Sequence, residues 1–340
     1  MNIITLDKKS FKDKFIHCYE KYLKLSSDAT IAIGIFHKDN YYVFGNGTGA
    51  SYLYDIGSIS KTFTAYLVLS LYCEGLIDLE DTVDKYIPLK KGSYPKIINF
   101  LTHTCGYNHL TPVELTVPSL LKSGYAKRNI YEKCTSDTVI KCLERRSKFK
   151  KTSKYAYSDF TYAVMAVLCE CVLKKSFKEI LEDFIKTKLS LDNTFVKRID
   201  DDSFPKAIKG KKELPFWIWN TNNPYIASGG IVSNITDMIK YIDLTINSNE
   251  DYIKNAHIIN EDIKTNSNIR ICKGWHSYQK SNQLWHVGGV STFRSTIIVN
   301  KIKKYGVVVL GNMKGKKSAN VNYLAKMIYS ELKYKRIKFK

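Results

Sequence analysis

The chain has 340 residues, of which 44% are hydrophobic and 25% are charged. This is the composition of an ordinary globular protein, and it excludes a disordered chain, a collagen and a coiled coil. The length predicts about two domains. Because no apolar run reaches about 18 residues, the sequence predicts no transmembrane segment.

The formal net charge of +21 comes almost entirely from lysine, since the chain has only seven arginines. Proteins that read nucleic acid rely on arginine for bidentate contacts, so no nucleic-acid partner is expected. The tail 333–340 alternates basic and aromatic residues. This pattern suits phosphate or lipid binding, but a solvated helix end explains it equally simply and is the favoured reading.

The eight cysteines are scattered and contain no C-x-x-C pair, which predicts reduced, mostly buried thiols rather than a disulfide framework. The first nine residues lack the long apolar core of a secretory signal. We therefore expect a cytoplasmic protein, with removal of a leader from an exported protein as the alternative.

The first third of the chain predicts a helix, a hairpin and a second helix. Residues 9–25 carry apolar side chains at helical spacing, and two β-branched runs at 30–36 and 41–44 flank a turn. The glycine-rich stretch 45–49 predicts a plain loop rather than a phosphate cradle, because no helix pattern follows it. A long apolar helix is expected at 58–73, with Gly75 as its stop signal.

The predicted secondary structure changes twice along the rest of the chain. Residues 76–250 are helix-rich and broken by prolines, whereas 293–299 and 305–310 are β-rich and 318–332 is again helical. Strands at both ends with helices between them predict a discontinuous sheet domain, 1–75 with 255–340, into which a helical domain, 76–254, is inserted. The active site is expected in the cleft between the two domains.

The most informative motif is S-x-x-K, formed by Ser58 and Lys61. A serine hydroxyl barely ionises at neutral pH and needs a nearby base. On a helix the two side chains face the same way, and backbone N–H groups at a helix N-terminus stabilise developing negative charge. The simpler alternative is a capping serine followed by a surface lysine.

Two further motifs follow in the order Tyr157-Ser158-Asp159 and His286-Val287-Gly288. With these three motifs, the chain resembles the serine β-lactamase and penicillin-binding-protein-like hydrolases. The resemblance is to the branch that holds class C β-lactamases, D,D-carboxypeptidases, D-aminopeptidases and esterases. It extends over residues 28–333, because four stretches outside the three motifs are also similar to segments of the family. These stretches are 74–81, 101–106, 228–233 and 307–312.

The resemblance implies an α+β fold, in which a mostly antiparallel sheet is flanked by helices from both termini and carries an inserted all-helical domain. It also implies an acyl-enzyme mechanism. Ser58 would attack a carbonyl, Lys61 would help to remove its proton, and Tyr157 would pass a proton to the leaving group, its acidity raised by nearby positive charge. The oxyanion hole would be formed by the N–H groups of Ser58 and Gly289.

The resemblance also implies residues that bind substrate or line the oxyanion hole. Besides Gly289, these are Asp159, His286, which would lie on an edge strand, and Gly288. Asp159 stands where asparagine is usual, and an ionised carboxylate only accepts hydrogen bonds. Reading the second motif as a degenerate S-D-N, with Ser158 as the proton shuttle, is an alternative. His286 replaces a lysine, and histidine there is more usual in peptidases and esterases than in dedicated β-lactamases.

The expected substrates are small molecules or peptides: D-amino-acid peptides or amides and β-lactams, with short acyl esters as an alternative. A non-catalytic penicillin-binding-like module that binds or senses is the other alternative. No cofactor and no metal are expected. His103 with Cys105 is interpreted as a structural stretch, Cys169 and Cys171 as helix positions, and the aromatic run 216–219 as either an acyl-pocket wall or a core contact.

Overall fold

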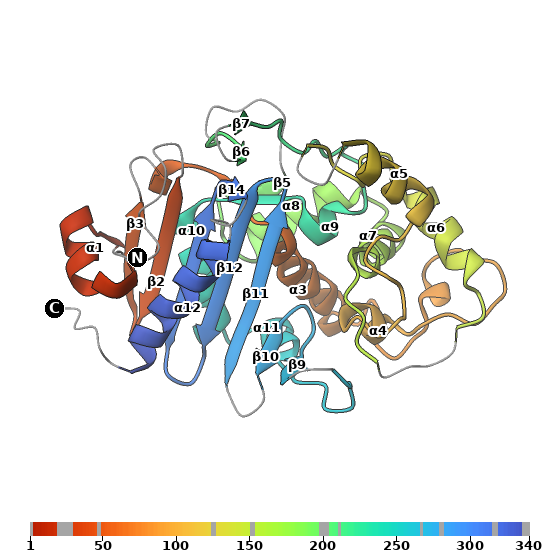
Figure 1. The fold of residues 1–340 in the computed structure, drawn as a ribbon. Coiled ribbons are helices and arrows are strands. Elements are labelled where there is room, and N and C mark those ends of the chain that lie inside the picture. Colours follow the sequence, from red (N-terminus) through yellow and green to blue (C-terminus); the bar gives the residue numbers. More distant parts are fainter. Residues whose placement is uncertain are drawn as a thin grey trace.

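The computed structural model describes residues 3–18, 30–45, 49–123, 127–149, 154–196, 204–209, 212–265, 268–278, 282–314 and 319–334. Its largest feature is an eight-stranded sheet in the order β1-β3-β2-β13-β12-β11-β10-β9 (Figure 1). Every neighbouring pair is antiparallel except β1 with β3. The strands are β1 (Ile3–Thr5), β2 (Ile31–His37), β3 (Asn40–Gly45), β9 (Ile269–Ile271), β10 (His276–Tyr278), β11 (Gln283–Val290), β12 (Phe293–Asn300) and β13 (Tyr305–Gly311).

The predicted hairpin is β2–β3, and the two predicted β-rich runs near the C-terminus are β12 and β13. The central strands β2 and β13 are buried along nearly their whole length, as expected for apolar strands covered on both faces. Sequence analysis did not predict β1, β9 or β10, which are only three residues long and have no alternating apolar pattern.

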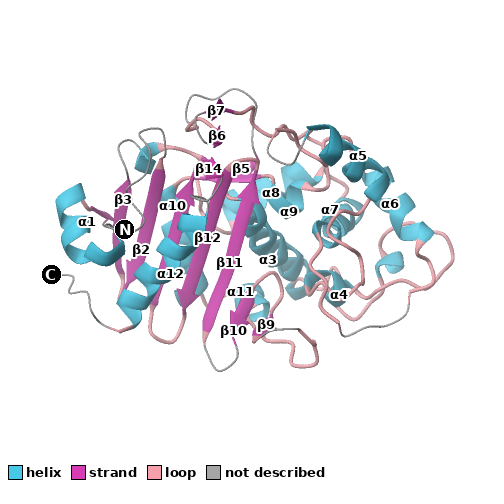
Figure 2. Ribbon diagram, viewed as in Figure 1, coloured by secondary structure: helices cyan, strands magenta, loops and turns pink. Residues whose placement is uncertain are grey.

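Helices from the two ends of the chain cover one face of the sheet (Figure 2). These are α1 (Lys8–Lys14) and α12 (Ala319–Lys333). Phe11 of α1 stacks on Phe44 of β3 with ring centroids 4.1 Å apart, and Leu324 and Ile328 of α12 are fully buried in the same cluster. The predicted fold class is therefore confirmed on this face. Residues 19–25 of the expected first helix and residues 335–340 of the tail lie outside the described residues, as do residues 46–48 of the glycine-rich loop.

The helical part contains α4 (Ile97–Leu101), α5 (Val113–Ser123), α6 (Ser136–Arg145), α7 (Asp159–Leu173), α8 (Phe177–Thr187), α9 (Ile226–Gly229), α10 (Ile235–Asn247) and α11 (Asp251–Ala256). Polar side chains begin several of them: Ser176, for example, forms a capping box with Glu179 at the start of α8. The middle of the chain also contains short strands that the sequence did not indicate. These include β5 (Phe195–Val196) and β8 (Ile231–Ser233), and β8 lies between β5 and β4 (Tyr54–Asp55) in a three-stranded sheet.

The central helix α3 (Ser60–Cys73) is buried along most of its length, since residues 60–71 are all buried. It ends before Gly75, whose φ of +74° suits the residue after a helix C-cap. The two-domain division stays a proposal, and α10, which falls in the range 76–254, packs against β2 and β13 of the sheet. Among the described residues, none of the helices is both long enough and apolar enough to cross a membrane.

Candidate active site

Ser58 lies in a single 3-10 turn, η2 (Gly57–Ile59), immediately before α3. Gly57 has a φ of +53°, a left-handed conformation that glycine adopts without a steric penalty. The carbonyl of Ile56 accepts a hydrogen bond from Ser295 Oγ at 2.7 Å, and the N–H of Ile56 donates to the carbonyl of Ile231 at 3.1 Å. The turn that presents the half-buried Ser58 is therefore held from β12 and β8.

Lys61 is fully buried one helical turn after Ser58. Its Nζ donates to three acceptors: Ser58 Oγ at 3.1 Å, Asp159 Oδ1 at 2.6 Å and the carbonyl of Ser228 at 2.8 Å. Burial lowers the pKa of Lys61 below its ordinary value, and the Asp159 carboxylate opposes that shift. The expected pairing of Ser58 with Lys61 is thus present, whereas the alternative of a surface lysine is excluded by burial.

Asp159 is the first residue of α7, and its side chain is only 7% exposed. While Oδ1 accepts from Lys61, Oδ2 accepts from the Tyr131 hydroxyl at 2.8 Å and lies 3.6 Å from His109 Nδ1. Burial raises the pKa of this carboxyl, but Lys61, His109 and the hydrogen bonds from Lys61 and Tyr131 together hold it below the ordinary value. Asp159 is therefore an ionised group whose two oxygens are both occupied by protein partners.

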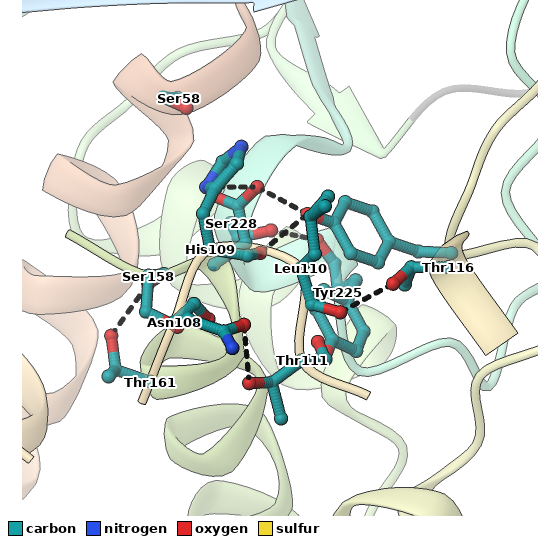
Figure 3. A network of polar contacts seen from close by, with 12 residues as sticks. Ser58, Asn108, His109, Leu110, Thr111, Thr116, Ser158, Thr161, Tyr225 and Ser228 are labelled. Carbon is teal, nitrogen blue, oxygen red and sulfur yellow. Dashed lines mark hydrogen bonds and ion pairs between the residues drawn. The ribbon is translucent and has the colours of Figure 1, made fainter. Parts of the chain in front are cut away.

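A loop at 108–111 lies over this carboxylate. Figure 3 shows His109 and its neighbours beside Ser158 and Ser228, with Ser58 on the adjacent helix. The Tyr131 hydroxyl also donates to the carbonyl of His109, and the Tyr225 hydroxyl donates to the carbonyl of Thr111. The Tyr131 and Tyr225 rings stack at 4.2 Å. Sequence analysis missed Tyr131 and His109 because no motif links isolated aromatic residues in loops to a site far along the chain.

Tyr157 lies on the extended segment before α7, with its ring 5.0 Å from Lys61 Nζ. Burial and the Asp159 charge raise its pKa well above the ordinary value, and the nearby Ser58 hydroxyl opposes them. This corrects the expectation that nearby positive charge makes Tyr157 more acidic. The main reason is that burial disfavours the charged phenolate, and the Asp159 carboxylate adds a negative charge near the phenol.

Four of the seven histidines surround Tyr157. Their ring centroids lie 4.6 Å (His103), 5.8 Å (His109), 6.4 Å (His276) and 6.4 Å (His286) from its ring. Burial, with Lys61 nearby, lowers the pKa of His276 to about 4 and those of His103 and His286 well below the ordinary value. These three rings are neutral at neutral pH, so the site contains little net charge beyond the Lys61–Asp159 pair.

His286, Gly288 and Gly289 lie on β11. The expectation that His286 occupies an edge strand is wrong, because the hairpin β9–β10 lies outside β11. Within the described residues, however, β10 pairs with β11 only at Leu284 and Trp285. Beyond Trp285, the cleft side of β11 therefore borders η2 rather than a further strand.

The glycines let this strand approach the turn that carries Ser58. A Cβ on Gly288 would lie 2.0 Å from the carbonyl oxygen of Ile56, and a Cβ on Gly57 would lie 2.5 Å from the backbone nitrogen of Gly289. Val290 closes the hairpin with Phe293, and backbone groups alternate along a strand, so the N–H of Gly289 points away from β12 toward η2. Gly57, the residue before Ser58, thus lies directly against the nitrogen of Gly289, and an oxyanion hole formed by the N–H groups of Ser58 and Gly289 stays a prediction.

A family model described as Beta-lactamase matches residues 30–329. The chain belongs to the Beta-lactamase family. Protein flp of Staphylococcus aureus (strain MW2) is 23% identical over 287 residues, which cover 81% of this chain and 54% of that protein. A protein named Beta-lactamase from Providencia stuartii is 26% identical over 201 residues, covering 58% of this chain and 47% of that protein. The chain spans about half the length of these curated relatives.

Solved structures share the fold of this chain. A penicillin-binding protein homologue from Pyrococcus abyssi, described as octameric, aligns with a TM-score of 0.76 at 22% identity and covers 97% of this chain and 78% of that chain. A class C β-lactamase aligns with a TM-score of 0.76 at 16% identity, covering 96% and 98%. The resemblance and the fold class stated from the sequence are both confirmed.

Other candidate residues of this Beta-lactamase family member have structural partners. Ser158 Oγ, the alternative shuttle, donates to the carbonyl of Asn108 at 2.8 Å, and Ser60 Oγ accepts from the N–H of Ile231. Burial raises the pKa of the Cys105 thiol well above its ordinary value, which disfavours a thiolate. Trp217 and Trp219 are buried in the main core. In the part of the chain that the structure describes, no three histidine, cysteine or carboxylate side chains form a metal-binding group.

Proposed function

We propose that the protein is a serine hydrolase that needs no metal and works through an acyl-enzyme on Ser58. The observation that carries the proposal is the contact between the buried Lys61 and Ser58 Oγ at 3.1 Å, with the ring of Tyr157 centred 5.0 Å from the same lysine nitrogen. A hydroxyl, an amine and a phenol that can share protons are what acyl transfer by serine requires. Family membership supports the hydrolase class, and the arrangement of these groups supports the acyl-enzyme.

In the proposed reaction, Ser58 Oγ attacks the substrate carbonyl carbon and its proton passes to the group around Lys61. The carbonyl oxygen becomes negative between the N–H groups of Ser58 and Gly289. Collapse of the intermediate breaks the bond to the leaving group, which takes a proton through Tyr157. Water then attacks the acyl carbon and breaks its bond to Ser58 Oγ. The hydroxyl of the water stays on the released acid, and its other proton passes through the same groups to Oγ and restores the serine.

The first proposed substrate class is amides and peptides of D-amino acids, with β-lactams as related amides. The structures that share this fold include one titled β-lactamase/D-alanine carboxypeptidase from Pseudomonas syringae, with a TM-score of 0.73 at 16% identity. One observation favours a second class, short acyl esters. Because His286 is buried and neutral, the third motif itself brings no positive charge for a substrate carboxylate.

The proposal is tested by labelling the protein with a fluorescent fluorophosphonate and a fluorescent penicillin, then mapping the adduct by peptide mass spectrometry. We expect both adducts on Ser58 and none on the Ser58→Ala variant. An unlabelled chain that still binds penicillin reversibly would instead indicate a non-catalytic binding module. A panel of D-amino-acid amides, D-Ala-D-Ala peptides, nitrophenyl esters and a chromogenic cephalosporin then ranks the substrate classes.

A further inference from the structure

The carboxylate at position 159 differs chemically from an amide in one decisive way. Ionised aspartate can accept a proton, whereas an asparagine amide cannot do so at physiological pH. In this protein the carboxylate directly contacts the group next to the serine. Asp159 Oδ1 is 2.6 Å from the Lys61 nitrogen, and the same nitrogen donates to Ser58 Oγ at 3.1 Å. The three atoms form a continuous hydrogen-bonded chain from serine to carboxylate.

The surroundings of these three hydrogen-bonded atoms favour proton transfer from the serine to the carboxylate. Lys61 is completely buried and the Asp159 side chain is 7% exposed, so little solvent competes for either group. The other acceptor of Lys61 is the carbonyl of Ser228, which cannot take a proton. Tyr131 donates to Asp159 Oδ2 and fixes the orientation of the carboxylate, so that Oδ1 stays directed at the ammonium group.

We infer that Asp159 is the proton acceptor for acylation and acts through Lys61, which relays the proton without a net change of charge. Lys61 Nζ gives one of its three protons to Asp159 Oδ1, and the aspartate becomes a neutral acid. The lone pair that this frees on Nζ takes the Ser58 proton as Oγ bonds to the acyl carbon, so the lysine is an ammonium again at the end of the step. The reverse transfer, ending at the leaving group through Tyr157, restores the ion pair.

This inference rests on the proposed function. It makes Asp159 a proton acceptor that acts on Ser58 through Lys61, and Tyr131 a positioning residue that orients the carboxylate. The titratable groups that face the relay come from several elements. They are Lys61 on α3, His109 and Tyr131 in loops, Tyr157 before α7, and the buried His103, His276 and His286. The test must therefore distinguish the effect of the Asp159 carboxylate on the pH profile from the effect of these histidines. Comparing proteins that differ only at residue 159 does so, because the histidines are the same in both.

The decisive experiment compares the pH dependence of nitrophenyl acetate hydrolysis for the unmodified protein and Asp159→Asn. With the relay, the unmodified protein needs an ionised carboxylate and stays active to low pH. The amide variant must use neutral Lys61 instead, so its acid limb moves up by several pH units. If neutral Lys61 were the base in both proteins, removing the carboxylate would lower the lysine pKa and move the acid limb down. A purely structural role would lower the rate at every pH without moving the limb.

Two further variants complete the test. Asp243→Asn is the matched control, since Asp243 on α10 also accepts from a tyrosine, Tyr41, at 2.7 Å but lies outside the site. We expect it to leave the profile unchanged. Tyr131→Phe keeps the carboxylate but removes one donor, so its acid limb should move up by about one pH unit. Combined with Asp159→Asn, Tyr131→Phe should move the limb no further.

Failure of the inference and failure of the proposed function give different results. If the unmodified protein is labelled by fluorophosphonate at Ser58 but the acid limb of Asp159→Asn stays in place or moves down, only the relay is wrong. If the folded, unmodified protein neither hydrolyses the ester nor takes up the label, the proposed function is wrong and the relay falls with it. Near-ultraviolet circular dichroism at each pH establishes that all the proteins compared are folded.

Discussion

Replacing Gly288 with alanine should separate the geometry of the site from its chemistry. The added Cβ would lie 2.0 Å from the carbonyl oxygen of Ile56 and 2.2 Å from Ser295 Oγ, whereas real Cβ contacts essentially never fall below 3.0 Å. The strand and the turn before Ser58 must therefore separate by about 1 Å. A displacement of this size at a reacting group costs about 100-fold in rate.

The matched control is Gly229→Ala, at a helical position close to the same turn. Its Cβ would meet Val290 Cγ2 at 3.6 Å and the carbonyl carbon of Gly57 at 3.9 Å, which are ordinary van der Waals distances. We expect Gly288→Ala to lose about 100-fold in kcat/KM for a nitrophenyl ester and about 1–3 kcal/mol of unfolding free energy. Gly229→Ala should lose little of either.

The assay is initial-rate kinetics with both variants, accompanied by urea unfolding and by the rate of fluorophosphonate labelling. If Gly288→Ala hydrolyses the ester as fast as Gly229→Ala, the close approach of β11 to the turn does not position Ser58. A rate loss without slower labelling would place the defect in deacylation instead of in the attack by Ser58.

Three other outcomes are expected. Ester turnover should fall by about 1,000-fold or more in each of three single variants, Ser58→Ala, Lys61→Ala and Tyr157→Phe. Double variants should lose little more than the worst single variant, because the three groups act as a unit. Additive losses in steady-state kinetics would contradict this. Burial lowers the pKa of His276 from 6.5 to about 4. The neutral ring therefore makes its full contribution to the unfolding free energy above about pH 6.5, and that free energy declines by about 3 kcal/mol as the pH falls to 4. Urea midpoints that do not change between pH 7 and pH 4 would show that the ring is not buried and neutral. Phe11→Ala should cost about 3–5 kcal/mol in urea unfolding because the ring is fully buried against Phe44, and a cost below about 1 kcal/mol would mean that α1 is not docked as described.

Local patterns in the sequence were sufficient for the elements that depend on neighbours along the chain. The spacing of Ser58 and Lys61 predicts one helical face, and the alternation around the β2–β3 turn predicts a hairpin, because both follow from backbone geometry. The short strands β9 and β10 pair with each other and join the sheet through the pairing of β10 with β11, so their own residues carry little signal.

The partners within the site were less accessible to sequence reasoning. Asp159 was expected to face substrate, a role that stays a prediction, but its contact with Lys61 joins residues 98 positions apart. Tyr131, His109 and His276 reach the site from loops and from a short strand, and no spacing links them to Ser58. Burial then reverses the expected acidity of Tyr157, which depends on the charge of a residue that only the folded chain brings near it.

The turn that holds Ser58 is tied to parts of the chain synthesised much later. Ile56 is bonded to Ile231 and Ser295, and Lys61 to Ser228, so a nascent chain emerging from the ribosome contains the reactive serine long before it contains the groups that orient it. A chain that stops before β12 therefore lacks the Ser295 hydroxyl that holds the carbonyl of Ile56 and, with it, one of the contacts that fix the turn around Ser58.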